Sequence, residues 1–410
     1  MKKDTSLEME AIRDGDYIDP AKKIILGLQH MFTMFGATVL VPIITGLNIS
    51  VALFMAGCGT LLFYVISKRK VPAFLGSSFA FIAPILVVAD KFGLPYACGG
   101  IVIAGLLYLI LSGLVSVFGV KKVLTFFPPV VTGPIIIVIG LKLAPVAIDM
   151  AKGNWGLALV GFVVVTAVSM YAKGFFKVLP VLTGIFVGYL VAILTGAVDF
   201  TPIAQAKWIG WPEFTVAKFN WTAIMIIAPV AIATMVEHIG DILAIGATVE
   251  KNLIEDPGLH RTLIGDGLAT SLSAMFGGPA NTTYSENTGV LALTKVYHPV
   301  IMAIAAVFAI LLGLVPKLGA IISTIPTSLI GGISIVLFGM IASIGIRTVV
   351  EHRVDFSRSR NLLISAVVLV LGIGGAVLSI PLGDGKIEIA GMALGAIVGI
   401  ILNKLLPESK

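Results

Sequence analysis

Two acidic residues, Glu237 and Glu286, stand out because they lie in a sequence that is otherwise mostly apolar. Glu286 belongs to the polar run 281–289 (Asn-Thr-Thr-Tyr-Ser-Glu-Asn-Thr-Gly), and Glu237 lies within the apolar segment 226–241. A carboxylate at membrane depth is costly and is retained mainly for function. The polar run must face protein or a water-filled cavity, because unpaired backbone groups are also costly there. The two acids therefore predict a binding site inside a membrane protein. The alternative places Glu286 in an extramembrane loop and makes Glu237 a structural hydrogen-bonding group.

The composition places this predicted site in a polytopic membrane protein. Of the 410 residues, 58% are hydrophobic and only 12% are charged, which is outside the range of soluble globular proteins. The net charge of +6 indicates orientation in a bilayer rather than binding to nucleic acid. Residues 1–23 are rich in charge and lack the layout of a cleavable signal, so they predict a cytosolic N-terminal segment.

The sequence carries none of the motifs expected of a cofactor enzyme or an ATP-driven pump. It has no Walker A loop, no dinucleotide fingerprint and no zinc-spaced His and Cys set. Cys58 and Cys98 lie in apolar, Gly-rich surroundings and are interpreted as packing residues. We therefore expect no cofactor, no metal and no enzymatic activity.

Apolar segments of about 20 residues predict the membrane-spanning elements. Fourteen candidates cover residues 24–46, 50–67, 72–90, 96–119, 124–148, 155–172, 178–197, 221–248, 262–277, 282–296, 298–315, 318–346, 361–379 and 387–406. Lys and Arg concentrate in the loops after the even-numbered segments, which should face the cytosol. Both termini are then cytosolic.

Internal repetition predicts how these segments are arranged. The run 76–81 resembles 281–286, and 127–133 resembles 325–331, in each case about half a chain apart. Because seven segments per half is an odd number, the halves must be inverted repeats. Hydroxyl and aromatic residues favour extended backbone, so segments 3 and 10 predict short strands that pair antiparallel and lead into half-helices. The alternative is a pair of re-entrant loops that only pack the bundle.

Several motifs together resemble one family of transporters. They are residues 28–32, 35–42, 76–82, 237–240, 256–261 and the polar run 281–289, with Glu286-Asn287-Thr288-Gly289, Thr294 and Lys295 in the spacing of a family signature. These residues resemble uracil permeases of the nucleobase–ascorbate transporter family. The resemblance covers the chain from about residue 22 to the last predicted segment.

The resemblance implies an all-α polytopic membrane protein with 14 transmembrane segments in two inverted repeats and two domains. A core domain, which binds substrate, would comprise residues 24–119 and 221–315. A gate domain would comprise residues 120–220 and 316–406. The family also implies a homodimer in the cell membrane, with no nucleic-acid partner.

The resemblance further implies which residues bind the base. The expected substrate-binding residues are Glu237, Glu286, Phe79, Ser285, Tyr284, Ala37 and Ser78. Uracil offers two N–H donors and two carbonyl acceptors on a flat ring, so carboxylates, backbone N–H groups and an apolar wall suit it. Uracil is uncharged, and its accumulation therefore requires a coupled ion. We expect a proton, carried by Glu237.

The chain departs from the best-known uracil permeases at two positions. Asp241 stands where they have His, and Phe338 is aligned with a Tyr, so a hydrogen-bonded pair is replaced as a unit. Asp241 is accordingly a second candidate for proton coupling, or else a satisfied polar group. His30 and Asn287 are expected to neighbour the site, as is Phe338. His238 should point away from Glu237 around the helix and is left out of the site.

The predicted function is a uracil:proton symporter that imports uracil by alternating access. The main alternative is a purine carrier of the same family for xanthine or urate, although Glu286 favours uracil. An anion transporter of the same fold is a further alternative, which the clustered carboxylates oppose.

Overall fold

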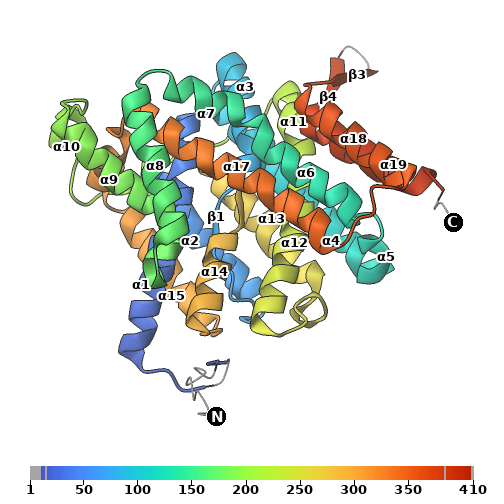
Figure 1. Ribbon diagram of the computed structural model, residues 1–410, viewed down its shortest axis with the longest axis horizontal. Coiled ribbons are helices and arrows are strands. Elements are labelled where there is room, and N and C mark those ends of the chain that lie inside the picture. The colour runs from blue at the N-terminus through green and yellow to red at the C-terminus, as the bar shows by residue number, and fades with distance from the viewer. Residues whose placement is uncertain (1–10, 14–15, 383–384, 408–410) are drawn as a thin grey trace, which may run out of the picture.

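The computed structural model describes residues 11–13, 16–382 and 385–407, and almost all of its elements are helices (Figure 1). The first half contains α1 (Pro20–Thr45), α2 (Ile49–Ile66), β1 (Leu75–Ser77), η1 (Phe79–Phe81), α3 (Ile82–Phe92), α4 (Leu94–Phe118), α5 (Val120–Leu124), α6 (Pro129–Lys142), α7 (Ala144–Ala151), α8 (Trp155–Tyr171), η2 (Gly174–Val178), α9 (Pro180–Leu194) and α10 (Thr201–Gln205). The second half contains α11 (Trp221–Ile227), η3 (Ala228–Val230), α12 (Ala231–Val249), η4 (Ile254–Gly258), α13 (Leu259–Met275), β2 (Asn281–Thr283), α14 (Ser285–Thr294), α15 (Val300–Gly313), α16 (Pro316–Ser323), α17 (Thr327–Glu351), α18 (Ser359–Ile373), β3 (Val377–Leu382), β4 (Gly385–Ala390) and α19 (Gly391–Leu405).

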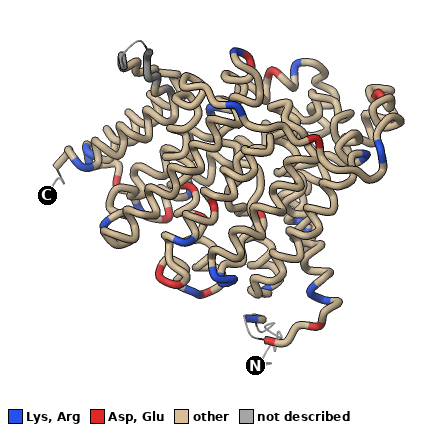
Figure 2. Tube along the Cα trace, turned by 180° about the vertical axis from the view of Figure 1, so that it is seen from behind, with Lys and Arg blue, Asp and Glu red and all other residues tan. Residues whose placement is uncertain are grey.

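Several helices are long and apolar enough to cross a membrane. Among the described residues there are six such helical stretches, and the pair α15 and α16, bent by 79°, would make a seventh. Four further apolar helices, α8, α9, α18 and α19, are shorter. Lys and Arg lie mostly toward the periphery of the molecule (Figure 2). The chain is therefore a multi-pass membrane protein, as its composition predicted.

Two short strands meet near the middle of this bundle. β1 pairs antiparallel with β2 in the register Leu75 with Thr283, Gly76 with Thr282 and Ser77 with Asn281. The ladder continues at both ends, where Tyr284 N donates to Phe74 O (3.0 Å) and Ser78 N donates to Ala280 O (2.8 Å). The pairing satisfies backbone groups that would otherwise be orphaned in the apolar interior.

A threonine from the preceding helix fastens each strand. Thr60 of α2 receives a hydrogen bond from Leu75 N (2.9 Å) and donates to Leu75 O (3.2 Å). Thr270 of α13 does the same for β2, since it receives from Asn281 N (3.2 Å) and donates to Asn281 O (2.8 Å). Both hydroxyls are buried. At the first residue of each strand, a threonine hydroxyl thus satisfies both the backbone N–H and the backbone C=O.

The helices around the strands pack closely through glycine. Gly105 of α4 and Gly267 of α13 face each other, and a Cβ on either would collide with the backbone carbonyl of the other. Close backbone approach of this kind is typical of membrane helix pairs. α13 also packs against α2, and α17 packs against α6, α7 and α8. The two strands are therefore held in a tightly packed helical frame.

One sequence prediction needs correction at the C-terminal end. The expected segments 361–379 and 387–406 overlap a hairpin in which β3 pairs antiparallel with β4, so the helices there are only 15 residues each. In the sequence the two residues between the strands are the Gly-Asp pair at 383–384, which is a hairpin signal where it separates two apolar runs, although hydropathy predicts helices on both sides. Hydropathy predicts helix for these residues because they are apolar, and it does not separate a strand from the end of a helix.

Candidate functional site

The two strands place the starts of two helices next to each other. β2 runs through Tyr284 directly into α14, whose first turn holds Glu286. β1 leads through η1 into α3. Helix starts expose free N–H groups and the positive end of the helix dipole. α12 packs against both β2 and α14, and it supplies two further acidic residues, Glu237 and Asp241.

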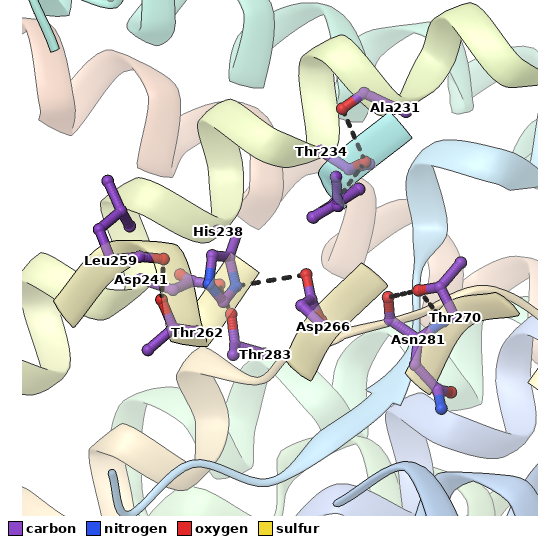
Figure 3. Close-up of polar contacts among 11 residues, drawn as sticks. Ala231, Thr234, His238, Asp241, Leu259, Thr262, Asp266, Thr270, Asn281 and Thr283 are labelled. Carbon is purple, nitrogen blue, oxygen red and sulfur yellow. Dashed lines mark hydrogen bonds and ion pairs between the residues drawn. The ribbon is translucent and has the colours of Figure 1, made fainter. Parts of the chain in front are cut away.

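Asp241 ties α12 to the second strand. Its carboxylate accepts hydrogen bonds from Thr283 Oγ1 (2.7 Å) and from Ser285 Oγ (3.0 Å). Figure 3 shows Asp241 beside Thr283. These bonds join the middle of α12 to the last residue of β2 and the first residue of α14. Asp241 therefore has a structural role, because it holds the end of β2 and the start of α14 against α12.

Glu237 lies one turn before Asp241 on the same helix and has a different environment. Its Oε2 atom is buried and has no hydrogen-bond partner within the described part of the chain. Asp241, Asp266 and Glu286 are the carboxylates that interact with it electrostatically. A buried acid without a partner is costly, and it is ready to bind a proton or to accept a hydrogen bond from a ligand N–H group. Glu286 is half-buried in the first turn of α14.

Tyr284 forms a second side of the site. Its ring packs against Gly76 of β1 so closely that a Cβ there would collide with it. Its hydroxyl donates to Ser77 O (3.0 Å) and receives a long hydrogen bond from Thr38 Oγ1 (3.4 Å). Ala37, the neighbour of Thr38 on α1, is also buried. The structure thus places Tyr284, which follows β2, next to α1, the helix that carries Ala37. The sequence predicts that both residues line the pocket.

Aromatic contact links the first strand to α17. Phe79 in η1 meets Phe338 of α17 edge to face, with ring centroids 6.1 Å apart. Phe338 is fully buried, whereas Phe79 is half-buried. The hydroxyl of the adjacent Ser78 is buried and has no hydrogen-bond partner among the described residues. Its backbone N–H is already engaged with Ala280 O, so of its two donors only the hydroxyl is free for a ligand.

His30 and Asn287 contact each other directly. Asn287 Nδ2 of α14 lies 3.0 Å from His30 Nδ1 and donates to the backbone carbonyl of His30 (3.1 Å). Both residues are buried. This contact holds the first turns of α14 against α1, so it positions the helix that carries Glu286.

Sequence reasoning missed two polar residues of this region. Thr283 was read only as part of a polar run, although its hydroxyl holds Asp241. Asp266 of α13 was not singled out, yet it is fully buried and lies 3.2 Å from His238. The signal for Asp266 was present, because any acid inside an apolar segment is a candidate for function.

A family model described as "Permease family" matches residues 21–380, most of the chain. The chain belongs to this permease family. The uracil permease of Bacillus caldolyticus is 48% identical over 399 residues, covering 94% of this chain and 92% of that protein. The uracil permease of Escherichia coli (strain K12) is 42% identical over 391 residues, covering 93% and 90%. Members of this permease family are transporters, so this chain is a transporter and not an enzyme.

Solved structures show the fold to which this permease belongs. The transmembrane domain of a cyanobacterium bicarbonate transporter, BicA, aligns with a TM-score of 0.63 at 15% identity, covering 93% of this chain and 96% of that one. The murine anion transporter Slc26a9 in its inward-facing state aligns with a TM-score of 0.69 at 12% identity, covering 96% and 69%. At these identities the likeness concerns the fold alone.

Proposed function

We propose that this permease imports uracil together with a proton across the cell membrane by alternating access. The observation that carries this proposal is that Glu237, Asp241 and Glu286 lie beside the paired strands, and that one carboxylate oxygen of Glu237 is buried without a hydrogen-bond partner in the described part of the chain. The high identity to proteins named uracil permease supports the choice of base.

Uracil suits this arrangement because its donors and acceptors match the groups on offer. Its two ring N–H groups would donate to the carboxylates of Glu237 and Glu286. Its carbonyl oxygens would accept from backbone N–H groups at Phe79 and Ser285, where the two half-helices begin. Tyr284, Ala37 and the Ser78 hydroxyl would complete the pocket wall. An anionic substrate is disfavoured because three carboxylates would repel it.

Proton coupling is assigned to Glu237, with Asp241 as a second participant. Of the three acids beside the paired strands, Glu237 is the one with a buried oxygen that lacks a hydrogen-bond partner among the described residues, so protonation would remove an uncompensated charge from the apolar interior. Asp241 already accepts two hydrogen bonds that stabilise its ionised form. We therefore expect Glu237 to take up and release the transported proton.

Alternating access would move a core domain against a gate domain. We assign residues 24–119 and 221–315 to the core and 120–220 and 316–406 to the gate, in two inverted repeats of seven segments. Support comes from the packing, since α13 contacts α2 and α4, whereas α17 contacts α6, α7 and α8. The matching threonine fastenings of β1 and β2 support the repeat. The homodimer expected from the family belongs to the same proposal and is tested by mass measurement in detergent.

The proposed orientation places both termini in the cytosol. Lys70 pairs with Asp256 (2.5 Å), and Arg13 pairs with Glu250, so the N-terminal segment lies at the same end as two base-rich loops. Base-rich loops face the cytosol. Labelling an added cysteine near residue 70 from outside intact cells would contradict this orientation.

Uptake of labelled uracil into proteoliposomes tests the function. An inward proton gradient should drive accumulation that excess uracil blocks and that xanthine and bicarbonate leave unchanged. The variant Glu237→Gln should bind uracil but lose gradient-driven accumulation. Glu250→Gln, at the cytosolic end of the same helix, is the matched control and should accumulate normally. Normal accumulation by Glu237→Gln would refute the assigned coupling, and block by xanthine alone would refute the choice of uracil.

A further inference from the structure

A cleft to which the proposed transport cycle gives no role lies at the end of the molecule opposite the N-terminus. Its volume is about 570 Å³, and it is bordered by the turn between α1 and α2, by residues 205–213 and by α16. Figure 1 shows α10, which leads into residues 205–213, at the margin of the helical bundle. α1 and α2 are long and apolar enough to cross a membrane, so the turn that joins them lies at the membrane surface. The cleft is therefore at the level of the lipid headgroups.

Contacts with neighbouring helices fix residues 205–213 at this cleft. Lys317 N at the start of α16 donates a hydrogen bond to Lys207 O (3.0 Å). The Trp211 ring meets Phe54 of α2 edge to face, with ring centroids 6.2 Å apart. The segment is thus anchored on two sides of the cleft, by α16 and by α2.

The start of α2 lines the cleft and carries unpaired hydrogen-bond donors. The backbone N–H groups of Ile49 and Ser50 open the helix and have no hydrogen-bond partner among the described residues. The Ser50 hydroxyl has no partner there either, although Ser50 is only 7% exposed. This hydroxyl lies against Gly319 of α16, where an added Cβ would come within 2.8 Å of it. Such donors, together with the positive end of the helix dipole, suit a phosphate group.

One cation and one anion line the same cleft. Lys207 and Glu213 are both exposed, and within the described part of the chain neither forms an ion pair, with the other or with a third residue. Glu213 would repel a simple anion, and Lys207 would repel a simple cation. A ligand that carries both charges would satisfy both side chains. The cleft therefore matches a zwitterion that contains a phosphate group and an ammonium group.

The surface around the cleft is apolar and aromatic. Trp208, Ile209 and Trp211 are between 72% and 81% exposed. Lys317 Nζ lies over the Trp208 ring, 4.5 Å from its centroid. Tryptophan beside lysine is typical of the membrane–water interface, where the ring meets lipid and the ammonium group stays near water and phosphate. A small soluble zwitterion would leave these apolar side chains uncovered, whereas a phospholipid would cover them.

We propose that this cleft binds the headgroup of a zwitterionic phospholipid, with ethanolamine phosphate as the group that is recognised. The phosphate accepts hydrogen bonds from the start of α2, from the Ser50 hydroxyl and from Lys207. The ammonium group donates to Glu213, which favours a primary ammonium group over a quaternary one that has no N–H. The acyl chains lie along the exposed apolar side chains of residues 208–211. Because α2 and α16 form opposite borders of the cleft, the lipid lies between the proposed core and gate domains.

Native mass spectrometry of the full-length protein, freed of lipid in detergent, tests this site. The probes are short-chain phosphatidylethanolamine, short-chain phosphatidylglycerol and soluble phosphoethanolamine. Lys207→Gln should weaken binding of the ethanolamine lipid about tenfold, because it removes a charged donor to the phosphate. Lys91→Gln replaces an exposed lysine at the end of α3, outside the cleft, and should leave this binding unchanged. Equal binding of the ethanolamine lipid by Lys207→Gln and by the unchanged protein would overturn the proposal.

Glu213→Gln separates recognition of a zwitterion from recognition of a simple anion. It removes the acceptor for the ammonium group, so it should weaken binding of the ethanolamine lipid about tenfold and should not weaken binding of the glycerol lipid. An equal loss for both lipids would overturn the assignment of a zwitterion. Soluble phosphoethanolamine that binds as tightly as the lipid would overturn the choice of a phospholipid. None of these measurements involves uracil, so their outcome is independent of the transport test.

Discussion

The close contact between Gly76 and Tyr284 allows a sharp test of the site. In Gly76→Ala the new methyl group would collide with the Tyr284 ring and lie 2.7 Å from Thr38 Oγ1. The ring cannot turn away freely, because its hydroxyl is bonded to Ser77 O of the neighbouring residue. Relief of the collision must therefore displace the whole Tyr284 side chain, which is part of the proposed wall of the uracil pocket.

The size of the effect follows from the packing. Overpacking a buried contact by one methyl group costs about 1–3 kcal/mol. If this strain is released by displacing Tyr284, uracil affinity should fall by about 5- to 160-fold. Isothermal titration with uracil in detergent measures the affinity, and thermal unfolding measures how much of the strain is released by loss of stability instead.

Two further variants make the result decisive. Gly113→Ala places a methyl group on the exposed face of α4, where nothing lies within 4 Å, and it should leave affinity unchanged. The double variant Gly76→Ala with Tyr284→Ala should bind no worse than Tyr284→Ala alone, since the colliding ring is gone. Wild-type affinity and stability in Gly76→Ala would refute the packing at this contact. Additive losses in the double variant would refute the collision as their cause.

Three other predictions concern polar contacts. Thr283→Val removes the 2.7 Å hydrogen bond to Asp241 while keeping the side-chain shape; it should cost about 1.5–3 kcal/mol, seen as lower thermal stability or weaker uracil binding, and an unchanged protein in both assays would refute the contact. Asn287→Ala removes two hydrogen bonds to α1 and should lower the unfolding temperature in detergent, whereas an unchanged temperature would contradict a positioning role. The Lys70 hydrogen bond holds the pKa of exposed Asp256 below its ordinary value, so the pair stabilises the protein above the ordinary carboxyl pKa and loses this effect as the pH falls through the lowered one. Lys70→Gln should therefore lower the unfolding temperature slightly at neutral pH and not at all in strong acid; a difference that persists there would contradict this.

Much of the fold class was readable from the sequence, because apolar composition and polar interruptions are local properties. Membrane-spanning helices follow from composition alone. The β3–β4 hairpin was missed because its residues are apolar as well, and hydropathy does not separate a strand from a helix end. The end of α18 and the start of α19 were displaced for this reason.

The site was predictable in part for a related reason. Glu237 and Glu286 are conspicuous in apolar surroundings, and the structure places both beside the paired strands. The partners of these acids depend on tertiary packing. Nothing in sequence spacing indicates that Thr283 holds Asp241, or that His238 turns away from Glu237 toward another helix. The helix period gives the direction in which a side chain points, but it does not identify the residues of other elements that the side chain contacts.

The pairing of β1 with β2 also has a consequence for synthesis of the protein. The two strands are separated by roughly two hundred residues, so β1 leaves the ribosome long before its partner exists. An unpaired strand edge is prone to wrong pairing, above all in a slowly assembling chain. Thr60 is made before β1 and bonds both backbone groups of Leu75. Its hydroxyl occupies the side of β1 that faces away from β2, so Thr60 can hold the new strand in place while the edge that pairs with β2 stays open until the second half of the chain is made.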